Sequence, residues 1–422
     1  MCGSVHILAE ICLTQVGRYE TTISNINPNG TYTVLYYPCF EVGDFQMYVL
    51  LIARGYPTKR YKTNGIFEFD QARALAKSGC KVVYAAVDVR SIRRWRKWGI
   101  EHQRIDGVDV HAINIPGGRI PRPVLQRMSG QGLLILYERI VDKHGVPDVL
   151  HAHFTGSGYT ALELKKKTNI PLVVTEHSSQ INQPFINPQL FEIAEEVYNC
   201  SDALIAVSPA LAENISRHFG ITPTYIPNMV DVDVFQHQPR KRGDGRFRMV
   251  STGNLIHTKR MDLTIEAFHK AFGSSSNAQL TIFGEGPKRK ELEDQIRKLG
   301  MEQQIYLMGM CSRSEIAKEL SHSDCFVLAS ESETFGVAYI EALASGVPVI
   351  ATKCGGPEAF VTEENGIMVD VNNVNQLVEA MLYIHAHVDN YNREQISQET
   401  RQEFSLDMVA RQIRKIYAEV LR

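Results

Sequence analysis

The sequence predicts an α/β protein with two Rossmann-like domains, and three observations support this fold class. Short apolar runs alternate with segments of helical periodicity, which is typical of doubly wound parallel sheets. The series occurs twice, on either side of residues 236–245, a polar stretch rich in Gly, Arg and Lys that is typical of a linker. The 422 residues, 44% of them hydrophobic, suffice for two or three domains.

The first domain is predicted at residues 47–235. A helix over 67–77 follows its first strand, and Gly79 closes that helix because glycine readily adopts the conformation that ends one. Another helix is predicted at 159–167. The strands are predicted at residues 47–52, 81–87, 148–151, 172–175, 203–207 and 223–226.

The second domain is predicted at residues 246–405, and a C-terminal helix follows at 406–422. The Gly-x-Gly at 284–286 stands alone, which is too weak a signal for a dinucleotide-binding fingerprint. The strands are predicted at residues 247–251, 279–283, 305–308, 325–328 and 347–351.

A pair of glutamates lies at the end of the strand at 325–328. Glu333 falls in the loop after the strand, and Glu341 falls about two turns into a helix that begins near Gly336. Backbone N–H groups at a helix start attract anions, so this crevice suits a diphosphate. These N–H groups belong to Phe335, Gly336 and Val337. Two solvated surface acids would show the same spacing, so the pair alone does not decide the function.

Several short motifs occur in the order found in one known family. They are Ile-Pro-Asn-Met-Val-Asp at 226–231, Gly-Asn-Leu-Ile-His-Thr-Lys at 253–259, Gly-Glu-Gly-Pro at 284–287 and the Glu-x7-Glu spacing of Glu333 and Glu341. With these motifs, the chain from about Met47 onward resembles the retaining glycosyltransferases of family four, among the glycosyl transferases group 1. The resemblance implies the GT-B fold, in which two Rossmann-like domains face each other across the active site and a C-terminal helix crosses back to the first domain.

The resemblance also assigns roles on the donor side. Lys259 would neutralise the diphosphate, Glu341 would bind the ribose hydroxyls and Glu333 would contact the transferred sugar as a catalytic residue. Gly253 and Gly284 would belong to the donor-binding loops. A preorganised cation fits this chemistry because the leaving nucleotide develops negative charge.

One position departs from the family pattern. The family usually has Arg directly after the glycine at 253, and here Asn254 occupies that place. Arg260, beside Lys259, is the predicted source of the second positive charge at the donor site. A lone lysine is more often a solvated surface residue, so the role predicted for Lys259 rests on its position after a strand.

Histidines and a glycine loop mark the acceptor side of the first domain. His177 lies in a segment that resembles the family's Thr-x-His sequence, and we predict it to be catalytic. His151 is better explained as a core or rim residue, whereas His153 is equally compatible with packing and with the acceptor site. Asn64 and Gly65 occupy the place of the family's Gly-rich acceptor loop, although a structural tight turn would also need a glycine there.

Residues 90–98 combine five basic residues with both tryptophans of the chain, within a first domain whose residues 47–170 carry 21 Lys and Arg against 10 Asp and Glu. This pattern suits an anionic membrane surface or a lipid-linked acceptor phosphate. A salt-bridged surface helix is the alternative, and no nucleic-acid-binding fold accompanies the segment. The residues predicted to make this contact are Arg93, Arg94, Arg96 and Lys97.

The remaining composition concerns compartment and cofactors. Eight cysteines occur without Cys-x-x-Cys pairs, which favours reduced core thiols and a cytoplasmic protein, here expected at the inner face of the membrane. No apolar run is long enough for a membrane span. We predict no metal and no cofactor beyond the nucleotide-diphosphate sugar as co-substrate.

Residues 1–46 fit this organisation poorly, because the first strand of a GT-B fold usually lies near the start of a chain. The segment is rich in Thr, Asn, Gly and Tyr and poor in charge. Three explanations stay open: a start of translation at Met47, an added small strand unit, or a disordered arm.

The sequence thus predicts a retaining glycosyltransferase that moves a sugar from a UDP- or GDP-sugar to a hydroxyl acceptor in cell-surface polysaccharide or glycolipid synthesis. Two alternatives remain. A GT-B-fold sugar-nucleotide epimerase would need acid and base groups around the sugar. An inactive nucleotide-sugar-binding partner would agree with the missing arginine at position 254.

Overall fold

A computed structural model describes residues 19–26, 32–38, 46–58, 60–61, 64–91, 96–117, 120–239, 245–273 and 277–422. The chain divides into two compact units at Met47, and each is described by itself. In the first unit, β1 (Tyr19–Ile26) pairs antiparallel with β2 (Tyr32–Pro38).

The first domain of the second unit is an eight-stranded sheet in the order β10-β9-β8-β7-β3-β4-β6-β5. All neighbours are parallel except the edge strand β5, which is antiparallel to β6. The central strands are buried on both faces because helices cover them, which explains their continuous apolar runs. The elements are β3 (Tyr48–Ala53), α1 (Ile66–Lys77), β4 (Lys81–Ser91), β5 (Gly99–Ile105), β6 (Val108–Gly117), α2 (Arg122–His144), β7 (Val149–His153), α3 (Phe154–Thr168), β8 (Leu172–Glu176), α4 (Pro188–Cys200), β9 (Ala203–Ala206), α5 (Pro209–Phe219) and β10 (Thr224–Tyr225).

The second domain is a six-stranded parallel sheet in the order β13-β12-β11-β14-β15-β16. The order turns back at β11, and the carboxyl ends of strands beside such a turning point are where open α/β sheets bind ligands. The elements are β11 (Phe247–Thr252), η1 (His257–Lys259), α6 (Met261–Phe272), β12 (Ala278–Phe283), α7 (Arg289–Leu299), β13 (Ile305–Gly309), α8 (Arg313–His322), β14 (Cys325–Leu328), α9 (Val337–Ala344), β15 (Val349–Thr352), η2 (Pro357–Ala359), β16 (Gly366–Val369), α10 (Val374–His387) and η3 (Val388–Asn390).

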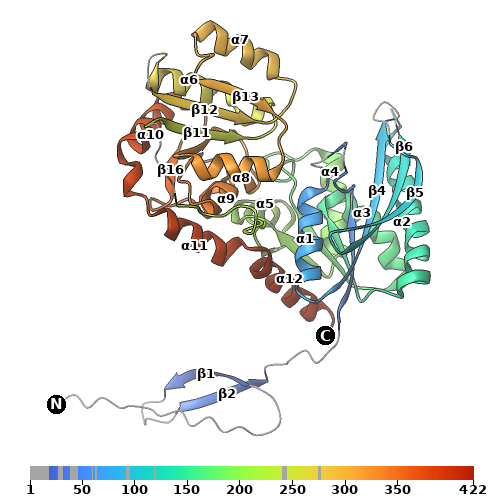
Figure 1. Cartoon of the computed structure of the whole chain (residues 1–422). Helices are drawn as coiled ribbons and strands as arrows, with labels where there is room; N and C mark the ends of the chain where they lie inside the picture. Colours follow the sequence, from blue (N-terminus) through green and yellow to red (C-terminus); the bar gives the residue numbers. More distant parts are fainter. Residues whose placement is uncertain are drawn as a thin grey trace, which may run out of the picture. The chain divides into compact units, whose positions relative to one another are not determined.

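The last two helices, α11 (Arg393–Phe404) and α12 (Leu406–Val420), return the chain to the first domain. Figure 1 shows α12 beside α1, and contacts join the two helices. Arg414 Nη1 on α12 donates to Ser78 O at 2.6 Å, and the hydroxyl of Tyr417 hydrogen-bonds His151 in the first core. The predicted two-domain GT-B architecture with a crossing C-terminal helix is confirmed. Among the helices that the structure describes, none has the length and hydrophobicity needed to cross a bilayer.

Candidate active site

Two glycine-containing loops lie side by side at the carboxyl ends of β11 and β12. The backbone N–H of Gly253 donates to Phe283 O at 3.0 Å. Gly284 has a φ of 142°, and a Cβ there would stand 1.8 Å from Gly253 O. Only glycine allows this approach, so the sequence Gly-x-Gly-Pro is required to bring the two loops together.

Lys259 and Glu333 meet at this edge of the sheet, although they are far apart in the sequence. Lys259 ends the short helix η1 after β11, and its Nζ contacts Glu333 Oε1. Ser330, just after β14, donates from Oγ to the same carboxylate oxygen at 2.7 Å. Glu333 is 8% exposed, so the carboxylate of this ion pair is largely shielded from solvent.

A loop of the first domain covers Glu333 from the other side. Asn182, in the loop after β8, donates from Nδ2 to the backbone oxygen of Glu333 at 3.4 Å. Its neighbour Gln183 donates to Ser332 Oγ at 3.3 Å. The predicted donor residues therefore lie between the two domains of the second unit.

Arg260 is held by acidic groups of its own domain. Its Nη1 lies 2.9 Å from Glu331 Oε1, and its Nη2 lies 3.0 Å from Asp262 Oδ2. These hydrogen bonds and charges raise the pKa of the guanidinium above its ordinary value. A donor phosphate would have to compete with both carboxylates for Arg260, and with the Glu333 carboxylate for Lys259.

The helix that follows Glu333 starts where the sequence predicted. Gly336 precedes α9, and the backbone of Phe335 and Val337 flanks it, while the Phe335 ring packs against Phe360 with centroids 5.1 Å apart. Glu341 is the fifth residue of α9, just over one turn from its start, so the expected two turns were wrong.

Glu341 belongs to a charged group that joins the two domains. Arg313, the first residue of α8, has its Nε 3.6 Å from Glu341 Oε1. Its Nη1 lies 2.6 Å from an oxygen of Asp70, which is on α1 of the first domain. The Asp70 and Glu341 side chains are 5% and 12% exposed, so a partly exposed arginine bridges two nearly buried carboxylates. The sequence did not indicate this bridge, since neither Asp70 nor Arg313 lies in a recognisable motif.

Burial governs the ionisation of Glu341. It raises the pKa of this carboxyl from 4.5 to about 7, and the nearby Arg313 only partly opposes the shift. A carboxylate that binds ribose hydroxyls would thus be half protonated near neutrality, until a ligand changes its surroundings.

This shift predicts how stability depends on pH. Between pH 4.5 and about 7 the unfolded carboxyl ionises while the folded one keeps its proton, so this group's contribution to stability is lost as pH rises. We expect Glu341→Gln to gain stability over the wild type as pH increases through this window. Chemical unfolding at several pH values measures the difference, and a difference independent of pH would contradict the shift.

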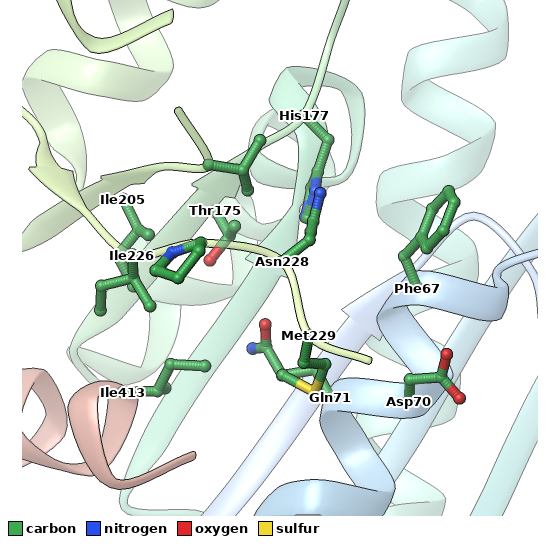
Figure 2. A pocket seen from close by; sticks show the side chains of 12 residues that line it. Phe67, Asp70, Gln71, Thr175, His177, Ile205, Ile226, Asn228, Met229 and Ile413 are labelled. Atoms are coloured by element: carbon green, nitrogen blue, oxygen red, sulfur yellow. The ribbon is translucent and has the colours of Figure 1, made fainter. Parts of the chain in front are cut away.

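A small pocket lies in the first domain, around the predicted acceptor residue His177, and is closed partly by α12. Figure 2 shows its lining, with Phe67 and Asp70 from α1, His177 after β8, Asn228 from the interdomain segment and Ile413 from α12. Because Asp70 also binds Arg313, this pocket adjoins the donor side. The pocket combines apolar walls with a few polar groups, and its volume of about 10 Å³ has room for about one water molecule.

Three histidines of the first domain, His151, His153 and His177, form a stack that leads into this pocket. His151 is fully buried and bonds Thr175 Oγ1 at 2.7 Å, which confirms it as a core residue. His153 Nδ1 lies 3.0 Å from His177 Nε2, so the buried His153 holds the His177 ring through this contact. Burial lowers the pKa of His177 to about 3, with Arg54 adding to the shift and a hydrogen bond to Asn228 opposing it. His177 is therefore a neutral imidazole at physiological pH.

The glycine loop before α1 is a tight turn. Gly65 has a φ of 64°, and a Cβ there would stand 2.2 Å from Gly55 O. Asn64 lies against Tyr56, its Nδ2 3.5 Å from the backbone oxygen. The glycine at 65 thus satisfies a structural need, and an acceptor contact for either residue stays a prediction.

Sequence reasoning missed Arg54, which directly follows β3. Its guanidinium lies 3.6 Å from the centre of the Phe154 ring, and its Nη2 lies 3.5 Å from Glu68. The side chain is 57% exposed and its charge acts on His177. A cation that follows the first strand of a Rossmann-like domain could have been suspected from position alone.

The basic segment at 90–98 differs from a continuous membrane-facing surface. Arg93 and Arg94 lie outside the described residues. Arg96 is 7% exposed, pairs with Asp88 and lies over the Tyr56 ring, so its guanidinium is not available to a membrane. Lys97 is exposed.

Comparison with known proteins finds glycosyltransferases that are similar to this chain in sequence and in structure. A family model described as Glycosyltransferase Family 4 matches residues 69–234, and one described as Glycosyl transferases group 1 matches residues 234–403. The chain is 29% identical to a D-inositol 3-phosphate glycosyltransferase of an Arthrobacter species over 71% of this chain and 76% of that protein. It is 25% identical to a Bacillus subtilis protein named as a teichuronic acid biosynthesis glycosyltransferase, over 79% and 88% of the two chains. The crystal structure of Anabaena HepE in complex with UDP and glucose superposes with a TM-score of 0.68 at 18% identity, covering 88% of this chain and 99% of that one.

Proposed function

The chain belongs to the group 1 glycosyltransferases, and we propose that it transfers a sugar from a nucleoside diphosphate sugar to a hydroxyl acceptor with retention at the anomeric carbon. The observation that carries this proposal is the contact of Lys259 with Glu333 at the carboxyl edge of the second sheet, where Asn182 of the first domain also binds Glu333. The Lys259–Glu333 pair suits a diphosphate and a sugar. The first-domain residues around His177 are the proposed acceptor side.

Each donor-side residue has its own role in the proposed transfer. Lys259 and the backbone N–H groups at the start of α9 stabilise the charge that develops on the leaving diphosphate. Glu341 accepts hydrogen bonds from the ribose, and Glu333 orients the transferred sugar. As the anomeric C–O bond to phosphate breaks, the acceptor oxygen attacks the same face. Its proton passes to the departing phosphate oxygen, so no side-chain nucleophile is required.

Two further observations support a proposal for the acceptor and the pathway. We assign the enzyme to the synthesis of a cell-surface polysaccharide or glycolipid, working at the cytoplasmic face of the membrane. The name of the Bacillus subtilis relative supports this class, and so does the excess positive charge of residues 47–170, which favours acceptors that carry phosphate or other anions.

Two measurements test the proposal. A thermal-shift screen of UDP- and GDP-sugars identifies the donor, because a ligand at 100 times its Kd stabilises the folded state by about 2.7 kcal/mol. Release of nucleoside diphosphate is then followed with and without candidate acceptors. Acceptor-dependent release supports transfer. Interconversion of the sugar nucleotide would instead indicate an epimerase, and binding without turnover over a broad acceptor panel would indicate an inactive partner.

Arg54 provides a test of the acceptor side. We expect Arg54→Ala to raise the KM for an anionic acceptor about tenfold, as for the loss of one partly exposed charged contact of about 1.4 kcal/mol. The KM for the donor should stay unchanged. Arg411→Ala, in an exposed pair with Asp407 on α12, is the matched control. An equal rise in both KM values would show that Arg54 acts on the whole site.

A further inference from the structure

Three histidines from three elements meet at the far edge of the first sheet. They are His102 on β5, His111 on β6 and His144 at the end of α2, and their ligand atoms all lie within 4.8 Å of one another. The Nε2 atoms of His111 and His144 are 3.0 Å apart. Asp109 adds an oxygen 3.1 Å from His102 Nε2.

The fold brings these residues together in a defined way. The hairpin of β5 and β6 turns at Asp106 and Gly107, and its register places His102 directly opposite His111, with ring centroids 4.4 Å apart. Facing residues of an antiparallel pair lie on the same side of the sheet. Helix α2 ends at His144 beside them. The cluster therefore depends on the register of β5 with β6 and on where α2 ends. No local sequence motif reveals either of these.

The spacing suits a metal ion. A tetrahedral zinc-type ion with nitrogen ligands at about 2.0–2.1 Å holds them about 3.4 Å from one another. The separation of 3.0 Å between His111 and His144 is close to this value, whereas the other separations, within 4.8 Å, would have to shorten by up to about 1.4 Å.

Some charged groups around the cluster oppose the binding of a cation, and others favour it. Lys143 Nζ lies 3.1 Å from His102 Nε2 and would have to turn away, which its exposed position allows. Lys81 Nζ binds the backbone oxygen of His144 and also adds positive charge. Asp109 offers a carboxylate, and the carboxyl end of α2 carries partial negative charge that favours a cation.

We propose that His102, His111 and His144 bind one divalent transition-metal ion of the zinc class. The ion joins the edge strand β5 to the end of α2. His111 lies early in β6, on the side of the sheet where the parallel strands begin, whereas the sugar-transfer site lies at their carboxyl ends. The site is thus structural, and it is independent of the proposed transfer reaction.

The test uses the full chain without a purification tag, treated with a chelator and then titrated with Co²⁺ or Zn²⁺. We expect one equivalent of Co²⁺ to give visible absorption bands of a tetrahedral centre, and one equivalent of Zn²⁺ to raise the melting temperature. His102→Ala should bind either metal at least tenfold more weakly, and it should still fold because His102 is exposed on an edge strand.

His144→Ala is a second variant, and His322→Ala, an exposed histidine on α8 of the other domain, is the matched control. Loss of the Co²⁺ bands in the two cluster variants, but not in the control, supports the site. Equal metal binding by the wild type and by both cluster variants would overturn the proposal, as would the absence of tetrahedral bands in the wild type.

Discussion

Lys259→Ala is expected to lower kcat/KM about 100- to 1000-fold. Removing one preorganised group that stabilises developing charge costs about 2.7–4 kcal/mol in a transition state. Here the Lys259 ammonium is held by Glu333, at an edge where the start of α9 supplies further N–H groups. The loss should fall mainly on kcat, because the charge on the leaving diphosphate grows as the bond breaks.

Steady-state kinetics with the donor found by thermal shift measures this effect. Lys270→Ala is the control, since Lys270 forms a surface pair with Glu266 on α6 of the same domain. Wild-type kcat/KM in Lys259→Ala would exclude the diphosphate role. An equal loss in the Lys270 variant would point to a general effect of removing charge.

Arg313→Ala should destabilise the second unit by about 3 kcal/mol. Removal of one partner from a buried ion pair leaves an unpaired charge behind, and the expected cost lies at the lower end of its usual range because the Arg313 side chain is 26% exposed. The carboxyls of Asp70 and Glu341 would both lose their cation. Burial already raises the pKa of Asp70, so the destabilisation should grow as pH rises and these groups ionise.

Chemical unfolding at neutral pH measures this loss, with Arg297→Ala as the control because Arg297 is 67% exposed in a surface pair. Asp70→Asn completes a double-mutant cycle. Additive effects of Arg313→Ala and Asp70→Asn would show that the two residues do not interact across the domains. A coupling of about 1 kcal/mol or more would support the bridge.

The sequence predicted the central strands well because they are buried on both faces. The run at 325–328 coincides with β14, and Gly336 precedes α9 as expected. Burial of a parallel sheet leaves a continuous apolar pattern, and glycine marks the position where the chain turns into a helix. The resemblance to the family, rather than this pattern, predicted a crossing helix at 406–422, and α12 spans Leu406–Val420.

Elements at the edge of the first sheet could not be predicted in this way. β5 carries Glu101, His102, Gln103 and Arg104 and is largely exposed, so no apolar run marks it. Its existence depends on pairing with β6, which is a tertiary effect. The histidine cluster depends on the same pairing and was therefore invisible as well.

The charged contacts show a similar limit. The motifs brought Lys259 and Glu333 into one site, since both follow strands of one parallel sheet. Arg313 and Asp70 lie in different domains, so their contact depends on how the domains meet. Arg96 looked like a surface charge beside tryptophans, yet it is buried against Asp88, because sequence alone does not show which basic residues have a partner.

A proton NMR time course of the full chain with its sugar nucleotide and an acceptor tests the central claim most directly. Transfer with retention predicts that a new anomeric signal appears only when acceptor is present, with the same anomeric configuration as in the donor. A product of the opposite configuration would contradict the proposed mechanism, and a changed sugar nucleotide without any glycoside would contradict transfer itself.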